Sequence, residues 1–373
     1  DRLRVRVVER HPDYGRAHIV SILVPGPGRR AAPCPHFERC GGCDLQHLDD
    51  ERQSVLKAQA ALETLRRLGR LERLPDARLV CGRPWAYRLR AQVRTEPAGD
   101  RVLVGYFERG SHTLVPIRVC PILLPELEAT VTGLGQVLGP DAPRRLDLAI
   151  GDDSVVTVAP PIESLPGGWP IPGWGGGGAV RRRVGPWTFE HDARAFFQAH
   201  AGLIGDLQRV VCGRARGELA VDLYAGVGLF ALPLARRYAR VIAVESDRVA
   251  ARFAARNARA NGCGNVEIAP VSAESWVRSM PKSVDRVVVD PPRTGLPRSV
   301  RRALNAARVP RLTYASCHPA TLARDLRDLV TEYSVVRLTL LDMFPQTGHI
   351  EMVVDLEPAA ASSTPVAPAT EAR

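Results

Sequence analysis

The first part of the chain contains short stretches in which apolar and polar residues alternate, the pattern of half-buried β-strands. Two such stretches lie within residues 1–24. Because two strands do not form a stable domain alone, we expect residues 1–30 to be the remnant of a small β-barrel. Three further stretches, separated by turns that contain proline or glycine, predict an antiparallel sheet over residues 87–93, 102–107 and 113–119.

A long helix is predicted between these two groups of strands, over residues 49–74. A glycine-rich stretch at 166–178 follows the predicted sheet, and we expect it to form a flexible linker or loop. The apolar side of the predicted helix comprises Val55, Ala58, Leu62 and Leu65.

The second half of the chain alternates short apolar runs with helical stretches, which is typical of a doubly wound parallel α/β sheet. The last run, residues 350–356, is expected to pair as a hairpin with residues 335–341. The tail at 357–373 is rich in Pro, Ala, Ser and Thr and is expected to be disordered. The runs that predict parallel strands are 219–223, 241–244, 266–268, 286–289 and 312–315.

Composition narrows the possible functions. The 373 residues carry 51 basic and 40 acidic side chains, a net charge of +11, and only Lys57 and Lys282 are lysines. A polyanionic partner such as nucleic acid would explain the charge, because arginine pairs with phosphate in a fork; a GC-rich genome that favours arginine codons would also explain it. No run approaches the roughly 20 apolar residues of a membrane span. Cysteines without a signal peptide indicate a reducing compartment, so we expect a cytoplasmic monomer that does not bind membranes.

Cys317 follows directly after an apolar run that predicts a parallel strand. His318 and Pro319 then interrupt the predicted strand, and an amphipathic helix follows. Open α/β sheets place their chemistry at the carboxyl ends of strands. A thiol with a pKa of about 8.5 becomes a nucleophile when a helix N-terminus or a cation stabilises the thiolate, and the following helix could do so. We therefore predict that Cys317 is a catalytic nucleophile and not an inert buried cysteine.

The sequence DLYAGVGLF, residues 222–230, places glycines at a predicted strand-to-helix turn, where the backbone can approach a ligand closely. The next strand ends at Glu245, where a carboxylate can accept hydrogen bonds from both ribose hydroxyls of a nucleoside. Position 231 is alanine, so the G-x-G-x-x-G motif of NAD sites is incomplete. The spacing therefore favours S-adenosylmethionine, with Gly226, Gly228 and Glu245 in its site.

Two carboxylates are predicted at the same edge of the sheet. Asp290 ends the strand in VVVDPPRTG and could hold the edge of a base, hold the methyl donor, or cap a helix. Enzymes that methylate exocyclic amines usually have an aromatic residue where Arg293 stands here, which argues against an amino target. Glu351 begins the strand in FPQTGHIEMV. There it could remove a proton from carbon, or it could be a surface charge at the sheet edge.

A second set of cysteines suggests a metal site. Cys34, Cys40 and Cys43 have the spacing C-x5-C-x2-C, and Cys120 lies in the sequence RVCPI. Four thiolates suit a [4Fe–4S] cluster or a tetrahedral zinc ion, and the spacing does not distinguish them. The remaining single cysteines are expected to pack in the interior; they are Cys81, Cys212 and Cys263.

On these motifs the chain resembles the RNA 5-methyluridine methyltransferase family, and within it the iron–sulphur-containing 23S rRNA branch. The resemblance runs from about residue 2 to residue 356 and rests on AFFQAH, DLYAGVGLF, DPPRTG, SCHPATLARD and the cysteine spacing. It implies an α/β, class I Rossmann-like methyltransferase domain, a central antiparallel β domain and a partial N-terminal OB or TRAM-type barrel, with helix 49–74 packed on the catalytic domain. The implied ranges are 1–30 for the barrel remnant, 31–48 and 75–185 for the central domain, 186–356 for the methyltransferase domain and 357–373 for the tail.

The resemblance also implies the site and the partner. Gln198, Tyr224, Glu245 and Asp290 would contact S-adenosylmethionine or the uracil, with Ser272 near the adenine. The partner would be RNA, with a single-stranded or loop uridine of 23S rRNA as the target. The implied ligands of a [4Fe–4S] cluster are Cys34, Cys40, Cys43 and Cys120.

The implied reaction answers a chemical difficulty, because C5 of uracil is a poor nucleophile. Addition of the Cys317 thiolate to C6 would turn the ring into an enolate that can take the methyl group at C5. Glu351 would then remove the C5 proton, and the thiolate would leave. The base must be unstacked to be attacked, which implies flipping. The alternatives are C5 methylation of tRNA uridine or of RNA cytosine, and a non-catalytic RNA-binding factor, against which the presence of Cys317, Glu351 and Asp290 argues.

Overall fold

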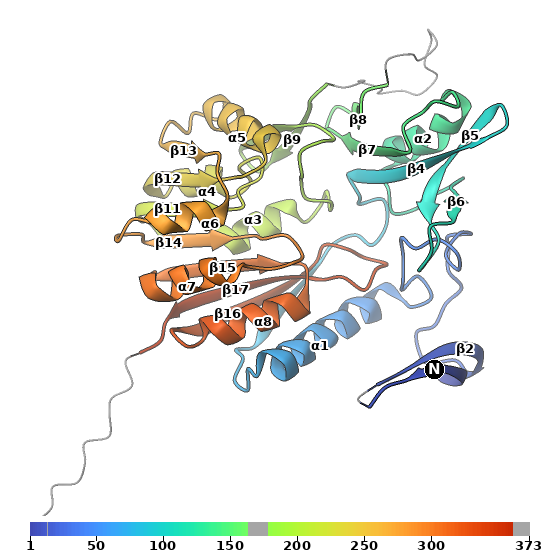
Figure 1. Cartoon of the computed structure of the whole chain (residues 1–373), viewed down its shortest axis with the longest axis horizontal. Helices are drawn as coiled ribbons and strands as arrows, with labels where there is room; N and C mark the ends of the chain where they lie inside the picture. The colour runs from blue at the N-terminus through green and yellow to red at the C-terminus, as the bar shows by residue number, and fades with distance from the viewer. Residues whose placement is uncertain (13, 163–177, 361–373) are drawn as a thin grey trace, which may run out of the picture.

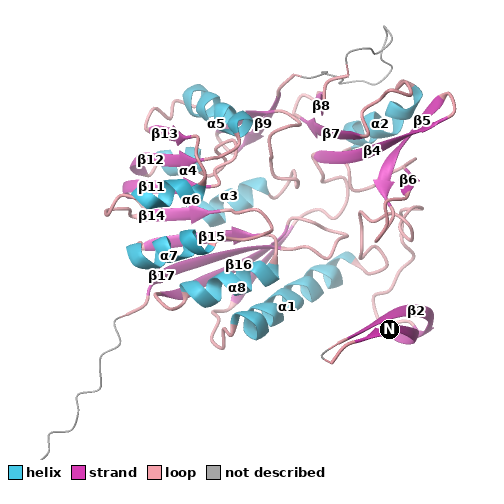
Figure 2. Ribbon diagram, in the orientation of Figure 1, coloured by secondary structure: helices cyan, strands magenta, loops and turns pink. Residues whose placement is uncertain are grey.

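The structure, a computed structural model, describes residues 1–12, 14–162 and 178–360. Within these ranges the chain forms sheets of eight, five, two and two strands, and most helices lie around the largest sheet (Figure 2). The predicted linker lies outside the described residues except for Gly178. The predicted tail is described only as far as residue 360.

The eight-stranded sheet is the scaffold of the second half of the chain. Its strand order is β13-β12-β11-β14-β15-β17-β16-β3. Strands β13 to β15 in this order are parallel, whereas β17 runs antiparallel to both of its neighbours. The predicted doubly wound sheet and the predicted final hairpin are confirmed. The strands are β3 (Ala77–Cys81), β11 (Gly217–Leu223), β12 (Tyr238–Val244), β13 (Val266–Ala269), β14 (Arg286–Val289), β15 (Arg311–Ser316), β16 (Tyr333–Asp342) and β17 (Glu351–Pro358).

Helices cover both faces of this sheet, as its nearly continuous apolar strands require. Successive residues of a strand face opposite sides, so Ala220 belongs to the core that includes residues of α3, α4 and α5, whereas Val221 belongs to the core that includes residues of α7, α8 and α1. Figure 1 shows α7, α8 and α1 along one face. The helices are α1 (Asp50–Gly69), α3 (Ile204–Cys212), α4 (Ala231–Ala235), α5 (Arg248–Ala260), α6 (Ala273–Trp276), α7 (Arg298–Ala307) and α8 (Pro319–Leu329), with a short 3-10 turn, η2 (Val277–Ser279).

Helix α1 differs from its prediction in two ways. It ends at Gly69 and not at residue 74, because Arg70 adopts a left-handed conformation with φ 54°. Its predicted apolar side is wrong near the start, where Val55 is 47% exposed. The buried residues there are polar: Gln53, Ser54 and Lys57. The hydrophobic periodicity could not reveal this face, because its partners lie near the other end of the chain.

Strand β3 corrects the predicted start of the central domain. It lies within the predicted range 75–185 but pairs in parallel with β16, from Ala77 opposite Leu338 to Cys81 opposite Asp342. Cys81 is exposed and does not pack in the interior as predicted, because it ends an edge strand. Cys212 and Cys263 are buried, as predicted.

The predicted antiparallel sheet is confirmed and has five strands in the order β6-β5-β4-β7-β8. One helix, α2 (Pro125–Gly133), and a 3-10 turn, η1 (Leu134–Gln136), pack against it through buried residues such as Leu127 and Leu134. The strands are β4 (Arg90–Ala98), β5 (Arg101–Phe107), β6 (Leu114–Pro116), β7 (Arg145–Ile150) and β8 (Val156–Ala159).

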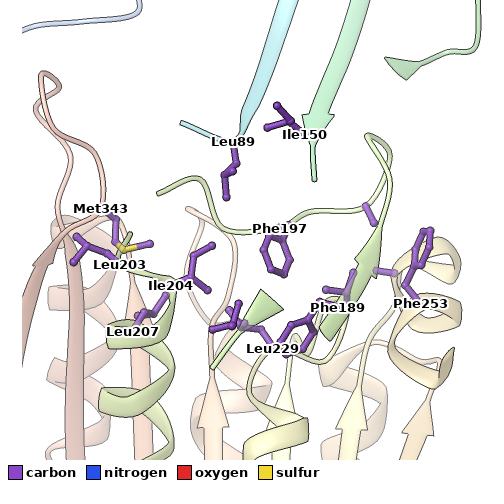
Figure 3. Packing of buried hydrophobic residues seen from close by; sticks show 14 of the residues in the cluster. Leu89, Ile150, Phe189, Phe197, Leu203, Ile204, Leu207, Leu229, Phe253 and Met343 are labelled. Atoms are coloured by element: carbon purple, nitrogen blue, oxygen red, sulfur yellow. The ribbon is translucent and has the colours of Figure 1, made fainter. Parts of the chain in front are cut away.

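A continuous core joins this sheet to one face of the larger sheet. Figure 3 shows Leu89 and Ile150, from the five-stranded side, above Phe197, with Leu229 and Phe189 on the other side of that ring. Phe197 is 2% exposed. The loop that carries Gln198 is therefore fixed by packing between the two sheets.

Two hairpins complete the fold. The predicted N-terminal strands are confirmed as β1 (Arg2–Arg10) and β2 (Gly15–Val24), which pair with each other and lie apart from the two larger sheets (Figure 1). The second hairpin, β9 (Val180–Val184) with β10 (Trp187–His191), is attached to α5 by hydrogen bonds between Asn257 and the backbone of Glu190.

Candidate active site and cysteine cavity

Most of the predicted site residues gather at the carboxyl edge of the parallel strands. Tyr224 and Gly226 follow β11, Glu245 follows β12, Ser272 lies shortly after β13, and Asp290 follows β14. Because parallel strands end at the same edge, residues that are distant in sequence become neighbours there.

Sheet register brings Cys317 and Glu351 together. Strand β15 pairs antiparallel with β17, and the last pair at this edge is Ser316 opposite Met352. One further step along each strand places Cys317 opposite Glu351. The two groups are close enough for the Glu351 charge to raise the pKa of the Cys317 thiol, after the larger effect of burial. A thiol and a carboxylate therefore face one site from adjacent strands.

Glu351 is a buried carboxyl group, and the partly buried carboxyl group of Asp290 disfavours its charge. Glu351 is 3% exposed, and its Oε1 atom has no hydrogen-bond partner among the described residues. Burial first, and then repulsion from Asp290, raise the pKa of Glu351 well above its ordinary value. Burial likewise raises the pKa of Asp290. The Gln198 side-chain amide donates to Asp290 Oδ2 at 3.3 Å. This arrangement can accept a proton and can present hydrogen-bonding groups to a planar ligand.

The environment of Cys317 differs from the prediction. Burial dominates and raises the pKa of its thiol to about 11. The group that favours the thiolate is Arg293, through its charge and a hydrogen bond. The first turn of α8 is instead capped by His318, whose Nδ1 accepts from the Thr321 amide at 3.3 Å. Arg293 is thus the cation that favours the Cys317 thiolate, a role that its place in the DPPRTG motif did not predict.

The glycine turn after β11 is open to a ligand. Gly226 has φ +56°, and no atom lies within 4 Å of the position a Cβ would take. The two oxygens of Glu245 accept from the amides of Gly226 at 2.8 Å and Asp247 at 2.7 Å. Tyr224 has φ +63° in the same turn. Glu245 therefore supports the turn, and each of its oxygens retains a lone pair for a further donor.

Two residues of this edge were not predicted as site residues. Asp222 is fully buried near the end of β11, and neither of its oxygens has a partner among the described residues. Such a carboxylate is costly unless a ligand cation or donor meets it. Phe196, two positions before Gln198, is 65% exposed although large and apolar, which suits stacking on a base. An acidic residue inside an apolar strand was the available signal for Asp222.

The cysteine set lines one cavity of about 230 Å³. Its walls include Cys34, Cys40, Cys43 and Cys120, with Gln46 beside them. Burial raises the pKa of Cys43 to about 11 and that of Cys120 to about 12, and neighbouring cysteines add to both shifts. Within the described ranges, no three His, Cys, Asp or Glu side chains are arranged around one point as ligands of a metal ion.

A larger hollow, of about 1100 Å³, lies at the opposite end of the parallel strands. Arg286 and Arg311, at the starts of β14 and β15, line it, and none of the predicted site residues does. We assign it no part in the chemistry. Among the described helices, none combines the length and the hydrophobicity needed to cross a bilayer.

Known proteins are similar to this chain in sequence and in fold. The profile of the tRNA (Uracil-5-)-methyltransferase family matches residues 193–359. The 23S rRNA (uracil(1939)-C(5))-methyltransferase RlmD of Alkalilimnicola ehrlichii is 32% identical over 392 residues, which cover 94% of this chain and 88% of that protein. An uncharacterized RNA methyltransferase of Thermosynechococcus vestitus is 33% identical over 95% of this chain and 90% of its own length.

A solved structure has the same architecture. The tRNA (uracil-54, C5)-methyltransferase of Pyrococcus abyssi, crystallised with S-adenosyl-L-homocysteine, superposes with a TM-score of 0.71 at 24% identity and covers 94% of this chain and 91% of its own. The predicted class I methyltransferase fold with an added central antiparallel sheet is thereby confirmed.

Proposed function

The chain belongs to the RNA uracil-C5 methyltransferase family, and we propose that it methylates a uridine of 23S rRNA through an adduct with Cys317 that Glu351 resolves. The methyl donor of the enzyme is S-adenosylmethionine, and its substrate is RNA. The observation that supports the chemical part of the proposal is the β15–β17 register, which sets a thiol opposite a buried carboxyl group whose Oε1 has no hydrogen-bond partner among the described residues.

The reaction follows from these two groups. The Cys317 thiolate adds to C6 of the uracil, and the electron pair that reaches C5 forms a bond to the methyl group of the donor, releasing S-adenosylhomocysteine. Glu351 then takes the proton from C5. The electron pair of that C–H bond re-forms the C5–C6 double bond, the C6–S bond breaks, and the Cys317 thiolate is released. Arg293 favours the thiolate at both ends of this cycle because it lies beside the sulphur.

The remaining residues at this edge of the sheet bind and orient the uracil and the methyl donor. Asp290, which accepts from Gln198, faces the edge of the base, and Phe196 offers its ring for stacking. Glu245 accepts from the ribose hydroxyls of the donor, Ser272 lies near its adenine, and Tyr224, Gly226 and Gly228 shape the turn around it. The carboxylate of Asp222, which has no partner in the part of the chain that the structure describes, suits the ammonium group of the donor's methionine moiety. S-adenosylmethionine supplies a methyl group that is electrophilic because it is bonded to a sulphonium.

We further propose that Cys34, Cys40, Cys43 and Cys120, which line the cysteine cavity, would hold a [4Fe–4S] cluster. The support is that three cysteines of residues 34–48 and the distant Cys120 line a single cavity, and burial disfavours the thiolates of Cys43 and Cys120 unless a cation is present. The uracil chemistry needs no electron transfer, so the cluster's part is structural.

The rRNA target rests on relatives that act on 23S rRNA and match along most of the chain. The test is to incubate the purified enzyme with tritiated S-adenosylmethionine and unmodified transcripts of 23S rRNA and of tRNA. We expect label only in the 23S transcript, recovered as 5-methyluridine on nucleoside analysis. Label in tRNA would overturn the assignment of 23S rRNA as the target, and label in 5-methylcytidine would overturn the assignment of uracil as the methylated base.

A further inference from the structure

We propose that residues 343–350, the loop between β16 and β17 that ends at Glu351, are held in their working position by Gln53 of α1 and Asp44 of the cysteine segment. We define the cysteine segment as residues 34–48. In this view Asp44, Gln53 and Gln346 are positioning residues for the proton-removal step. The inference rests on the proposed role of Glu351 as the base.

The centre of this loop is Gln346, which is completely buried and has φ +68°. A non-glycine residue keeps such a backbone conformation only when its surroundings hold it. Gln53 does so with two bonds: its Nε2 donates to Gln346 Oε1 at 2.9 Å, and its Oε1 accepts from the Gln346 amide at 3.0 Å. Gln346 Nε2 also donates to Asp50 Oδ1 at 2.7 Å. Helix α1 is therefore hydrogen-bonded to both the side chain and the backbone of Gln346.

The cysteine segment holds the same loop from another direction. The amides of Asp44 and Leu45 both donate to the Gln346 carbonyl, at 2.8 and 3.0 Å. The Asp44 carboxylate accepts from the Gly348 amide at 3.0 Å. Gly348 stands three residues before Glu351, and Asp44 directly follows Cys43. Arg109 fixes Asp44 in turn, with bonds of 2.5 Å to its carboxylate and to the Cys43 carbonyl. Asp44 thus connects the cysteine segment with the loop that leads to Glu351.

The start of the loop is fixed as well. Lys57 Nζ donates to Asp342 Oδ1 at 2.5 Å and to the Phe344 carbonyl at 3.1 Å, and Ser54 donates to Asp342 Oδ2 at 2.7 Å. The Tyr87 hydroxyl donates to the Pro345 carbonyl at 2.9 Å. These contacts hold the loop up to residue 345, and β17 begins at Glu351, which pairs with Leu341; Asp44 and Gln53 hold the stretch between them, residues 346–350.

A shift of Glu351 affects one step more than the others. Addition of the thiolate and methyl transfer need Cys317 and the donor. Removal of the C5 proton needs a Glu351 oxygen within hydrogen-bonding reach of that carbon. A misplacement of about 1 Å can slow such a step about 100-fold. Loosening the loop should therefore slow release of the RNA from the methylated adduct while methyl transfer to it continues.

The experiment compares Asp44→Ala with Asp44→Asn and with Asp147→Ala. Asp44→Asn keeps an oxygen acceptor for Gly348. Asp147 is also paired with an arginine, Arg145, but lies in the five-stranded sheet away from the loop. Gln53→Ala removes the contact from the α1 side. In single turnovers with tritiated donor, we measure label entering a complex that survives denaturing electrophoresis and the rate at which that complex disappears. Hydrogen exchange of the peptide spanning residues 343–350 is measured on the same proteins.

We expect Asp44→Ala to slow the loss of the complex about 10- to 100-fold, with label entry near the wild-type rate and faster exchange at Gly348. Asp44→Asn should be partly restored, Gln53→Ala should resemble Asp44→Ala, and Asp147→Ala should resemble wild type. Wild-type release and exchange in both Asp44→Ala and Gln53→Ala would overturn the inference. Glu351→Gln serves as the reference: if it traps no complex, the proposed base is wrong, whereas the exchange measurement still tests the loop contacts.

Discussion

Glu245 provides a quantitative test of the donor site. Its two oxygens accept from the amides of Gly226 and Asp247 at 2.8 and 2.7 Å, and a carboxylate has about four acceptor positions. Two positions thus remain for the ribose hydroxyls of the donor. Glu245→Ala would remove both acceptors and leave the Gly226 amide without its partner. Lost hydrogen bonds to a charged group weaken binding by about 1–3 kcal/mol, which raises the dissociation constant about 5- to 150-fold.

The assay is isothermal titration calorimetry with S-adenosylhomocysteine. Glu245→Gln keeps one oxygen and should lose less affinity than Glu245→Ala. Glu267→Ala is the matched control, because it also removes a carboxylate; Glu267 lies on β13 and pairs with Arg240 of the neighbouring strand β12. The control should bind as wild type does. A dissociation constant for Glu245→Ala within about twofold of wild type would refute the assignment and leave Glu245 with only its support of the turn.

Three further predictions follow from buried groups. Lys57→Met should lower the free energy of unfolding by about 3–5 kcal/mol in urea titrations, because Asp342 would keep a buried charge without its partner. The double variant Lys57→Met/Asp342→Leu should regain most of this stability, and an equal loss in the single and the double variant would contradict the prediction. The rate of alkylation of Cys317, followed by peptide mass spectrometry, should rise about tenfold per pH unit from pH 7 to 10, because the pKa of about 11 makes the thiolate fraction grow with pH. Arg293→Met should raise that pKa and slow alkylation at every pH, and an alkylation rate independent of pH would contradict both expectations. Anaerobically purified protein should contain about four irons per chain, whereas one zinc and no iron would exclude the cluster.

The sequence was most informative about the carboxyl edge of the sheet. Two of the parallel strands, β12 and β14, are followed directly by a carboxylate, Glu245 or Asp290, and strand ends can be recognised from apolar runs and turns. Their convergence then follows from the topology of parallel sheets. The pairing of Cys317 with Glu351 needed in addition the register of an antiparallel pair, which depends on where the loop after β16 ends.

The contacts that hold Glu351 could not be predicted from the sequence. The polar residues Gln53 and Lys57 resemble a solvated helix face, because their partners Gln346 and Asp342 lie 293 and 285 residues away. The effect of burial on Cys317 was missed for a similar reason: a strand-to-helix turn suggested a helix N-terminus, whereas neighbours from other strands decide how much water reaches the thiol.

The central claim is that Cys317 forms the adduct and Glu351 resolves it, and one measurement tests both. Glu351→Gln is incubated with the RNA substrate and with donor labelled in its methyl group, and the products are separated by denaturing electrophoresis. We predict a labelled protein–RNA band, because addition and methyl transfer proceed while the C5 proton cannot leave. The band should be absent from Glu351→Gln/Cys317→Ala. Turnover of Glu351→Gln at the wild-type rate, without a trapped band, would contradict the account.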